Sequence, residues 1–123
     1  MFQVDEQRAW LRRQLAASLQ ALALAGSAQP VLFPEWAPTA SELAMHFEHW
    51  LSAIREHEAI AIAAREADAL AALERKLQTM SHDGAEFDAD LWTEAAVAES
   101  PHWEEVRCLA RAALAAAEGE GEA

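Results

Sequence analysis

The sequence is poor in glycine, proline, tyrosine and β-branched residues. Among its 123 residues are four glycines, four prolines, no tyrosine, four valines, three isoleucines and three threonines. Strands are enriched in β-branched and aromatic residues, so there is little material for a sheet. A phosphate-binding loop is also excluded, because neither GxxxxGK[ST] nor GxGxxG occurs. The 31 alanines instead favour helix, for which alanine has the best intrinsic propensity, and the expected class is all-α.

Cysteine and long apolar runs are also scarce. The one cysteine, Cys108, rules out an internal disulfide and a cysteine-rich zinc site. Its neighbours Val106 and Leu109 on an expected helix favour a small buried hydrophobe over a reactive thiol. No uncharged apolar run reaches the ~18 residues of a membrane span. The first residues carry acids and arginines where a signal peptide has its apolar stretch, so we expect a cytoplasmic protein that does not enter a membrane.

The first helix is expected from about Asp5, as N-cap, to Ala25. Gly26 follows as the left-handed residue that ends it. Leucines recur on one face at i, i+4, i+8 and i+11, which indicates a single buried stripe. These leucines are Leu11, Leu15, Leu19 and Leu22.

Residues 26–38, here called the proline strap, contain three prolines that prevent a regular helix. The strap also carries Val31, Leu32, Phe33 and Trp36, which is more apolar surface than a simple connection needs. One interpretation is that its aromatic residues close the end of the helix bundle. The other is an extended epitope that presents Phe33 and Trp36 to a partner.

Residues 39–80 form the longest stretch without a helix breaker. They begin at a capping box, Thr39 to Glu42, and end at the turn predicted at 81–84. Apolar residues from Leu43 to Ile54 share one face, and those from Ile62 to Met80 share another, about a quarter turn away. We expect the helix to bend or break near 56–60. A continuous helix would meet a second copy through its second face, and this predicts a homodimer.

Two short helices are expected after Gly84. Asp88 caps the first, with Phe87 and Trp92 as a hydrophobic staple, and Ser100-Pro101 begins the second. The inner face of the second helix is supplied by Val106, Ala110, Ala113, Leu114 and Ala117. The predicted architecture is a small bundle of four or five helices with one long central helical region. It forms a single domain over residues 1–117, followed by a disordered acidic tail at 118–123.

Charge is distributed unevenly along the chain. The net charge is −12, and residues 81–123 account for −9 of it. Such a surface repels nucleic acid and anionic membranes and attracts cationic partners. The one basic cluster, Arg8, Arg12 and Arg13, is expected to pair with acids of a neighbouring helix. The carboxylates expected to contact a partner are Asp88, Asp90, Glu94, Glu99, Glu104 and Glu105.

The best candidate for metal chemistry is the set Glu42, His46 and His49, at i, i+4 and i+7 of an expected helix. A carboxylate and two imidazoles could ligate zinc or iron. The spacing is neither HExxH nor the Glu-x-x-His of di-iron bundles. The favoured interpretation is therefore a polar flank in which Glu42 completes the capping box. No nucleophile or acid–base pair stands out, so we expect neither an enzyme nor a cofactor.

The leading hypothesis is a non-enzymatic protein whose acidic C-terminal third binds a basic surface of a partner protein. It would compete with nucleic-acid phosphates for an Arg/Lys-lined groove, as nucleic-acid mimics and inhibitors of the antidefence or immunity type do. The alternative is an accessory or assembly subunit that docks on a larger complex through apolar contacts, supported by the strap and five tryptophans. A metal-binding bundle is the third option. Ionic strength separates the first two, because only electrostatic binding weakens steeply with salt.

Overall fold

The structure is a computed structural model that describes residues 2–24, 28–34, 37–57 and 62–122. These residues form five α-helices and two short 3-10 helices, and no strand occurs among them. The elements are α1 (Phe2–Ala23), η1 (Gln29–Leu32), α2 (Thr39–Glu56), α3 (Ala64–Met80), η2 (Ala89–Trp92), α4 (Glu94–Glu99) and α5 (Pro101–Glu122). The all-α class predicted from the alanine content is confirmed.

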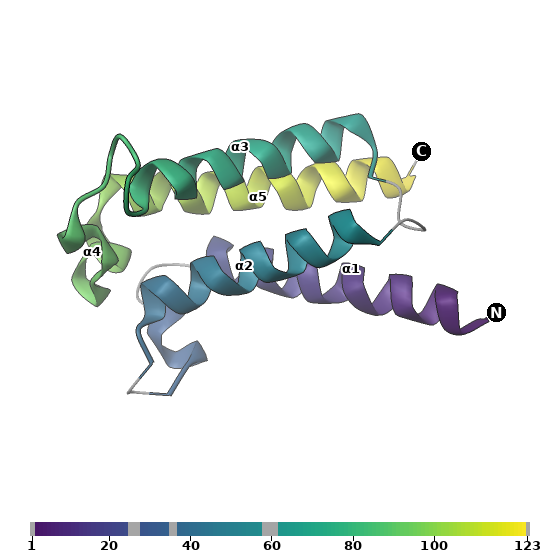
Figure 1. Ribbon diagram of the computed structural model, residues 1–123, viewed down its shortest axis with the longest axis horizontal. Coiled ribbons are helices and arrows are strands. Elements are labelled where there is room, and N and C mark those ends of the chain that lie inside the picture. The colour runs from purple at the N-terminus through teal and green to yellow at the C-terminus, as the bar shows by residue number, and fades with distance from the viewer. Residues whose placement is uncertain (1, 25–27, 35–36, 58–61, 123) are drawn as a thin grey trace.

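The four long helices α1, α2, α3 and α5 run alternately in opposite directions (Figure 1). Helix α5 packs against both α3 and α1, and α1 also packs against α2. The short elements η2 and α4 lie at one end of the bundle, here called the α4 end, whereas α1 begins and α5 finishes at the other. Each helix in the described part of the chain is too short or too polar to cross a bilayer.

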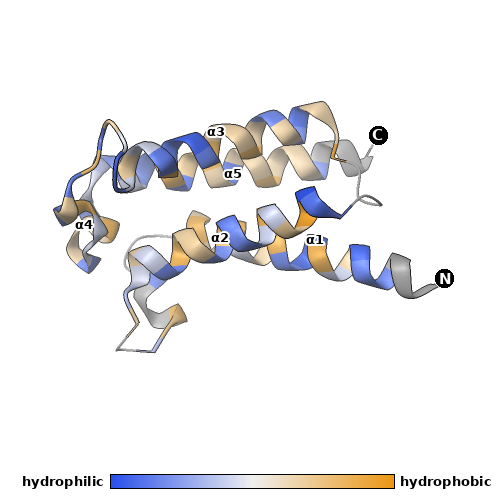
Figure 2. Cartoon of the chain, viewed as in Figure 1, coloured by the Kyte–Doolittle hydropathy of each residue, from blue (hydrophilic) through white to orange (hydrophobic). Residues whose placement is uncertain are grey.

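The core combines large side chains from α1, α2 and α3 with Trp103 and several small side chains from α5. The predicted leucine stripe of α1 is buried, and Ala110 and Ala113 of α5 are completely buried. Figure 2 shows polar and apolar residues alternating along the long helices, as expected when one side of each helix is buried. The largest fully buried apolar side chains are Leu22, Leu43, Phe47, Leu51, Ile54, Leu70, Leu73, Leu77, Met80, Val97 and Trp103.

The region 39–80 forms two helices. Helix α2 ends at Glu56 and α3 begins at Ala64, so the break predicted near 56–60 is confirmed. Arg55 of α2 donates to both carboxylate oxygens of Glu74 in α3, at 2.9 and 3.0 Å. Both predicted apolar faces pack into the same core. They therefore need no second copy to cover them, and the argument for a homodimer loses its basis.

The start of the first helix is predicted wrongly, whereas α2 begins at Thr39 as predicted but without its predicted cap. Helix α1 begins at Phe2 and already contains Asp5, which therefore is not its N-cap. Helix α2 has Pro38 as its N-cap, with no side-chain cap hydrogen bond, and Thr39 is its first residue. The capping box does not form because Pro38 holds the N-cap position and Thr39 is already inside the helix, where it is buried. Helix α1 ends at Ala23, two residues before the predicted end, and the predicted cap at residue 26 lies outside the described residues.

The end of α1 is capped by two side chains, one from the nearby strap and one from α5. Nε2 of the fully buried Gln29 donates to the carbonyl oxygens of Ala21 and Leu22, both at 3.0 Å. Nη1 of Arg111 donates to the carbonyl oxygen of Ala23 at 3.2 Å. The last carbonyls of a helix lack partners within it, so these bonds satisfy α1 and attach the strap to the bundle.

The turn predicted at 81–84 follows the end of α3 at Met80. Asp83 adopts a left-handed conformation, with φ of 74°. Gly84 is packed so closely on the backbone that an added Cβ would collide with the carbonyl oxygens of Gln78 and Thr79. Glycine is required here because of this close approach.

The segment after the turn is capped twice. Asp88 is an N-cap as predicted, with its Oδ1 accepting from the backbone N–H of Asp90 at 2.9 Å, but it begins only the 3-10 helix η2. Helix α4 begins after Thr93, whose Oγ1 accepts from the N–H of Ala96 at 3.2 Å. The helix predicted to start at Asp88 therefore starts later, because Thr93 supplies a second cap.

The predicted staple between Phe87 and Trp92 is replaced by other contacts. The ring centroid of Phe87 lies 5.2 Å from that of His82. Trp92 packs edge-on against Trp103 at 5.5 Å, and its Nε1 donates to the carbonyl oxygen of Met80 at 2.8 Å. Trp92 thus connects the end of α3 to the start of α5.

Helix α5 begins as predicted, with Ser100 before it and Pro101 as its first residue. Oγ of Ser100 accepts from the N–H of His102 at 3.2 Å. The helix was predicted to be short, but it has 22 residues. It continues through Glu122, into the segment predicted to be a disordered tail from residue 118.

Candidate functional site: the α4 end

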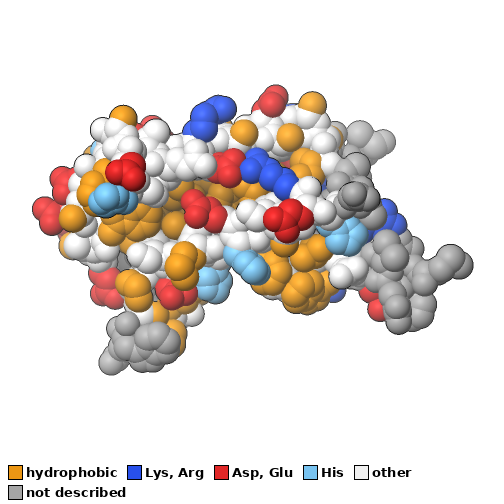
Figure 3. All heavy atoms as spheres, viewed as in Figure 1, with side chains coloured by type: hydrophobic (Ala, Val, Ile, Leu, Met, Phe, Trp, Pro, Cys, Tyr) orange, Lys and Arg blue, Asp and Glu red, His pale blue; other side chains and the backbone are white. Residues whose placement is uncertain are grey.

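The acidic residues predicted to contact a partner lie along η2, α4 and the first turns of α5. Their side chains are exposed to solvent, and Figure 3 shows acidic side chains at the end of the molecule where α4 lies. The predicted residues are Asp88, Asp90, Glu94, Glu99, Glu104 and Glu105. Residues 81–105 carry eight acids and neither lysine nor arginine. The Lys and Arg side chains that pair with these acids among the described residues belong to α3 and to later turns of α5.

Two of the six predicted carboxylates are held in ion pairs. Oε2 of Glu104 accepts from Nε of Arg107 at 2.8 Å, and Oε1 lies 3.5 Å from Arg111. The hydrogen bond from Arg107, together with its positive charge, holds the pKa of Glu104 below the ordinary value. Glu105 lies 3.0 Å from Nζ of Lys76. These two glutamates therefore take part in ion pairs within the protein.

The other four carboxylates have no lysine or arginine partner in the part of the chain that the structure describes. Within the described residues, neither lysine nor arginine forms a salt bridge with Asp88, Asp90, Glu94 or Glu99. Asp88 accepts a backbone hydrogen bond in its cap, whereas Glu94 and Glu99 lie at the two ends of α4. Together they form the acidic surface of the α4 end.

Hydrogen bonds and ion pairs around Lys76 hold the segment that carries this acidic surface in place. The Lys76 side chain is only 8% exposed, and its Nζ donates to Oε1 of Glu86 at 3.0 Å and to Nδ1 of His102 at 2.9 Å. Oε1 of Glu86 also accepts from Oγ1 of Thr79 at 2.7 Å. Burial alone would lower the pKa of Lys76, but hydrogen bonds to Glu86 and Glu105 outweigh it and raise the pKa. The loop before η2 is thereby attached to α3 and α5.

A second buried cation attaches α4 itself. Arg107 is almost completely buried, and its Nη1 donates to the carbonyl oxygen of Val97 at 2.7 Å. The same guanidinium binds Glu104, so its charge is satisfied. The short helix α4 is thus fixed to α5 by a charge-assisted hydrogen bond as well as by the buried Val97.

Of the two strap residues predicted to form an epitope, Phe33 lies within the described residues and Trp36 does not. Phe33 is partly buried against the core, and its ring lies 5.6 Å from that of His46. Trp36 lies outside the described residues. Leu32, which precedes Phe33, is exposed.

The metal candidates do not converge on one point. Nε2 of His46 lies 3.2 Å from Oε2 of Glu42, but the ring of His49 packs edge-on against Trp50 at 4.5 Å. In the part of the chain that the structure describes, no three His, Cys, Asp or Glu side chains gather in a way that could hold a metal ion. The predicted burial of Cys108 is wrong, since this residue lies on the exposed side of α5 beside Arg111.

An aromatic pair between α1 and α2 combines an exposed Trp10, which the sequence did not predict as a contact residue, with a half-buried Trp50. Trp10 of α1 is 45% exposed and packs edge-on against Trp50 of α2 at 5.2 Å. Met45, 55% exposed, lies on the same helix as Trp50. The signal was present, because Trp10 falls outside the leucine stripe of α1.

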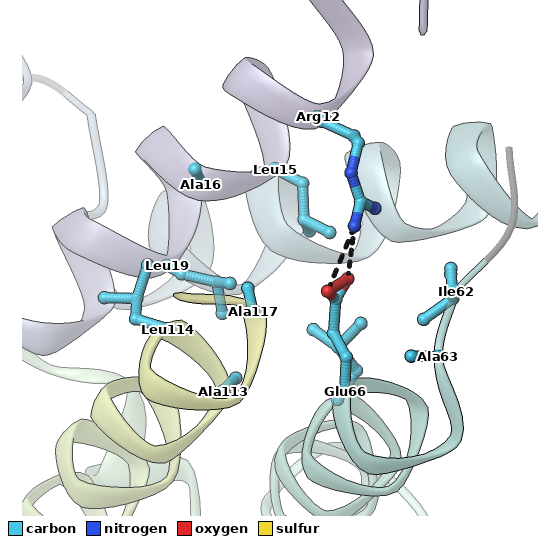
Figure 4. Close-up of a pocket in the computed structure, with 11 residues that line it drawn as sticks. Arg12, Leu15, Ala16, Leu19, Ile62, Ala63, Glu66, Ala113, Leu114 and Ala117 are labelled. Atoms are coloured by element: carbon cyan, nitrogen blue, oxygen red, sulfur yellow. Dashed lines mark hydrogen bonds and ion pairs between the residues drawn. The ribbon is translucent and has the colours of Figure 1, made fainter. Parts of the chain in front are cut away.

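A pocket also opens between α1, α3 and α5, away from the α4 end. Its volume is about 590 Å³, and Figure 4 shows Arg12 of α1 reaching Glu66 of α3 at its edge. Nη2 of Arg12 donates to both carboxylate oxygens of Glu66, each at 3.1 Å. This confirms that Arg12 pairs with an acid of another helix. Glu66 precedes Leu70 by four residues and Leu73 by seven, so its burial was readable from the helical period.

Comparison of the chain with protein-family models, with curated proteins and with solved structures gives no match. Its function is therefore inferred from its own residues.

Proposed function

We propose that the protein is a non-enzymatic binding protein whose α4 end contacts a basic surface of a partner protein. The observation that supports this most directly is the set of four exposed carboxylates, Asp88, Asp90, Glu94 and Glu99, without cationic partners on a firmly attached end of the bundle. A preorganised array loses less conformational entropy on binding than a flexible acidic tail does.

The kind of partner follows from the chemistry of the array. Carboxylates on a fixed helical frame can replace phosphates on a surface lined by arginine and lysine, as in a nucleic-acid-binding groove. The negative field would accelerate the encounter with such a surface and repel nucleic acid itself. We therefore favour a nucleic-acid mimic or inhibitor over a protein that binds nucleic acid directly.

A pair of charge-reversed variants tests this function. Asp90→Lys with Glu94→Lys and Glu99→Lys reverses the acidic surface and leaves the Asp88 cap intact. The matched control, Glu56→Lys with Asp68→Lys and Glu118→Lys, changes the net charge equally at exposed sites elsewhere. Wild-type protein immobilised on resin would capture a partner from the native host, and the purified partner would then be titrated against all three proteins.

The surface variant should weaken binding by at least about tenfold more than the control does. Wild-type affinity should also fall steeply as salt is raised. Equal losses in the two variants would show that only net charge matters, and unchanged affinity in both would contradict the proposal.

A second function is favoured by the exposed Trp10. Together with Met45 and Trp50 it gives α1 and α2 an apolar surface suited to an accessory subunit that docks on a larger complex. Tryptophan is enriched at binding hot spots. Trp10→Ala would abolish such docking, and binding would change little with salt.

A further inference from the structure

We propose that the pocket between α1, α3 and α5 binds an aliphatic carboxylate, with its hydrocarbon chain inside the pocket and its carboxylate on Arg12. The pocket lies toward the end of the bundle opposite α4. This proposal is therefore independent of the acidic surface.

The walls suit a hydrocarbon chain. Four alanines line the pocket where larger residues would fill it, and the remaining apolar lining comes from leucine and isoleucine side chains. The volume of about 590 Å³ falls within the ~300–1,000 Å³ of small-molecule sites. No aromatic side chain of the described residues lines it, which favours an aliphatic ligand over one that stacks. Figure 4 shows Leu15 pointing into the hollow and Ile62 facing it from the opposite side.

The edge of the pocket suits a carboxylate. Glu66 is only 4% exposed, and both of its oxygens accept from the single nitrogen Nη2 of Arg12. Among the described residues, Nη1 and Nε of Arg12 have no acceptor, and this side chain is 42% exposed. A guanidinium can bind two carboxylates through different nitrogens, so a ligand carboxylate can bind while Glu66 stays paired.

A cationic headgroup fits less well. It would have to displace Arg12 from Glu66 and leave the guanidinium without its partner. The net charge of −12 does not prevent binding of an anion, because repulsion from distant acids is screened beyond about 8 Å in physiological salt. The two charged residues that line the pocket are Arg12 and Glu66, and Glu66 is already paired with the guanidinium through Nη2.

Dodecanoate, dodecanol and dodecyltrimethylammonium share one chain length and differ in headgroup, so they serve as probes. Each would be titrated into wild-type protein below its micelle concentration, by calorimetry and by amide chemical shifts. Dodecanoate should bind about tenfold more tightly than either of the others. The shifted amides should belong to the segments 12–19, 62–70 and 113–117.

Two variants separate the pocket from nonspecific binding. Ala117→Phe fills the pocket and should weaken dodecanoate binding at least about tenfold, whereas Ala115→Phe, on the exposed side of α5, should not. Arg12→Gln with Glu66→Gln keeps an uncharged pair and should remove the preference for dodecanoate over dodecanol. Circular dichroism would check that each variant is folded.

Equal affinity for the three probes, unchanged dodecanoate binding in Ala117→Phe, or no saturable binding of dodecanoate would each overturn the proposal.

Discussion

Arg107 and Lys76 are buried cations whose partners lie on different elements of the α4 end. Arg107 binds the last turn of α4 through the carbonyl oxygen of Val97, and Lys76 binds Glu86 in the loop before η2. A buried charge is tolerated only when it is paired and hydrogen-bonded. Both residues therefore stabilise the frame on which the exposed carboxylates stand.

Arg107→Ala should lower the free energy of unfolding by roughly 2–3 kcal/mol, because the Val97 carbonyl would lose a buried charge-assisted bond. Arg75→Ala, at an exposed position of α3, should change it by no more than about 0.5 kcal/mol. Urea unfolding followed by circular dichroism measures both. Equal losses of stability in the two variants would mean that the buried guanidinium of Arg107 stabilises the fold no more than an exposed arginine does.

The ionisation of Glu86 should make the stability of the protein depend on pH. Hydrogen bonds from Thr79 and then Lys76 lower its pKa below the ordinary value of 4.5. Its ionised form therefore stabilises the fold above the unfolded-state pKa, and this contribution is lost as pH falls through the lowered folded-state pKa. Glu86→Gln should reduce stability at neutral pH and flatten its decline below about pH 5.

Thermal unfolding across that pH range provides the measurement for Glu86→Gln. Asp90→Asn, which removes an exposed carboxylate without a cationic partner, should leave the decline unchanged. Parallel curves for wild type and Glu86→Gln would argue against a role for this carboxylate in stability.

The sequence predicts which acidic residues gather at the α4 end, but it does not predict which of them form ion pairs. Glu94 and Glu99 look like Glu104 and Glu105 in the sequence, yet only the latter pair meets cations. Lys76 is far from Glu105 along the chain, so that contact depends on how α3 packs against α5. The burial of Cys108 was predicted wrongly because Val106 and Leu109 near it are apolar, whereas Cys108 itself lies on the exposed side of α5.

At the scale of elements, the turn between α3 and η2 sets where the α4 end lies. Gly84 allows the chain to pass directly over the last carbonyls of α3. The backbone N–H of Glu86 then donates to the carbonyl oxygen of Thr79 at 2.8 Å. A side chain at residue 84 would push this crossing apart.

Gly84→Ala should therefore destabilise the protein by about 1–3 kcal/mol, since the new methyl group collides with backbone that cannot move aside easily. Ala85→Ser at the neighbouring exposed position is the control and should be nearly neutral. The melting temperatures of the two variants give the comparison. A Gly84→Ala variant as stable as wild type would show that the turn can open without cost.

The sequence predicts the presence of the long helices better than it predicts the residues at which they begin and end. The stripes of α1, α2 and α3 follow the helical period, and the structure buries them. The capping box failed because Thr39 fits an N-cap pattern in the sequence, whereas in the structure Pro38 is the N-cap and Thr39 is the first helical residue. Asp88 and Thr93 both match caps, and local sequence alone does not show which of them starts the α-helix.

At the scale of the whole molecule, the two ends of the bundle differ in chemistry. Among the described residues, the α4 end presents carboxylates without a lysine or arginine partner, whereas the pocket toward the opposite end has apolar walls and the Arg12–Glu66 ion pair. The charge asymmetry was visible in the sequence. The pocket was not, because it depends on alanines and leucines from three helices that meet only after folding.

The central claim concerns where a partner binds, and hydrogen exchange of the complex with a captured host partner tests it most directly. We predict slower amide exchange in residues 88–105, with protection that fades as salt is raised. The Trp10 and Met45 surface should exchange as it does in the free protein. Protection confined to α1 and α2 and insensitive to salt would contradict the claim and favour apolar docking.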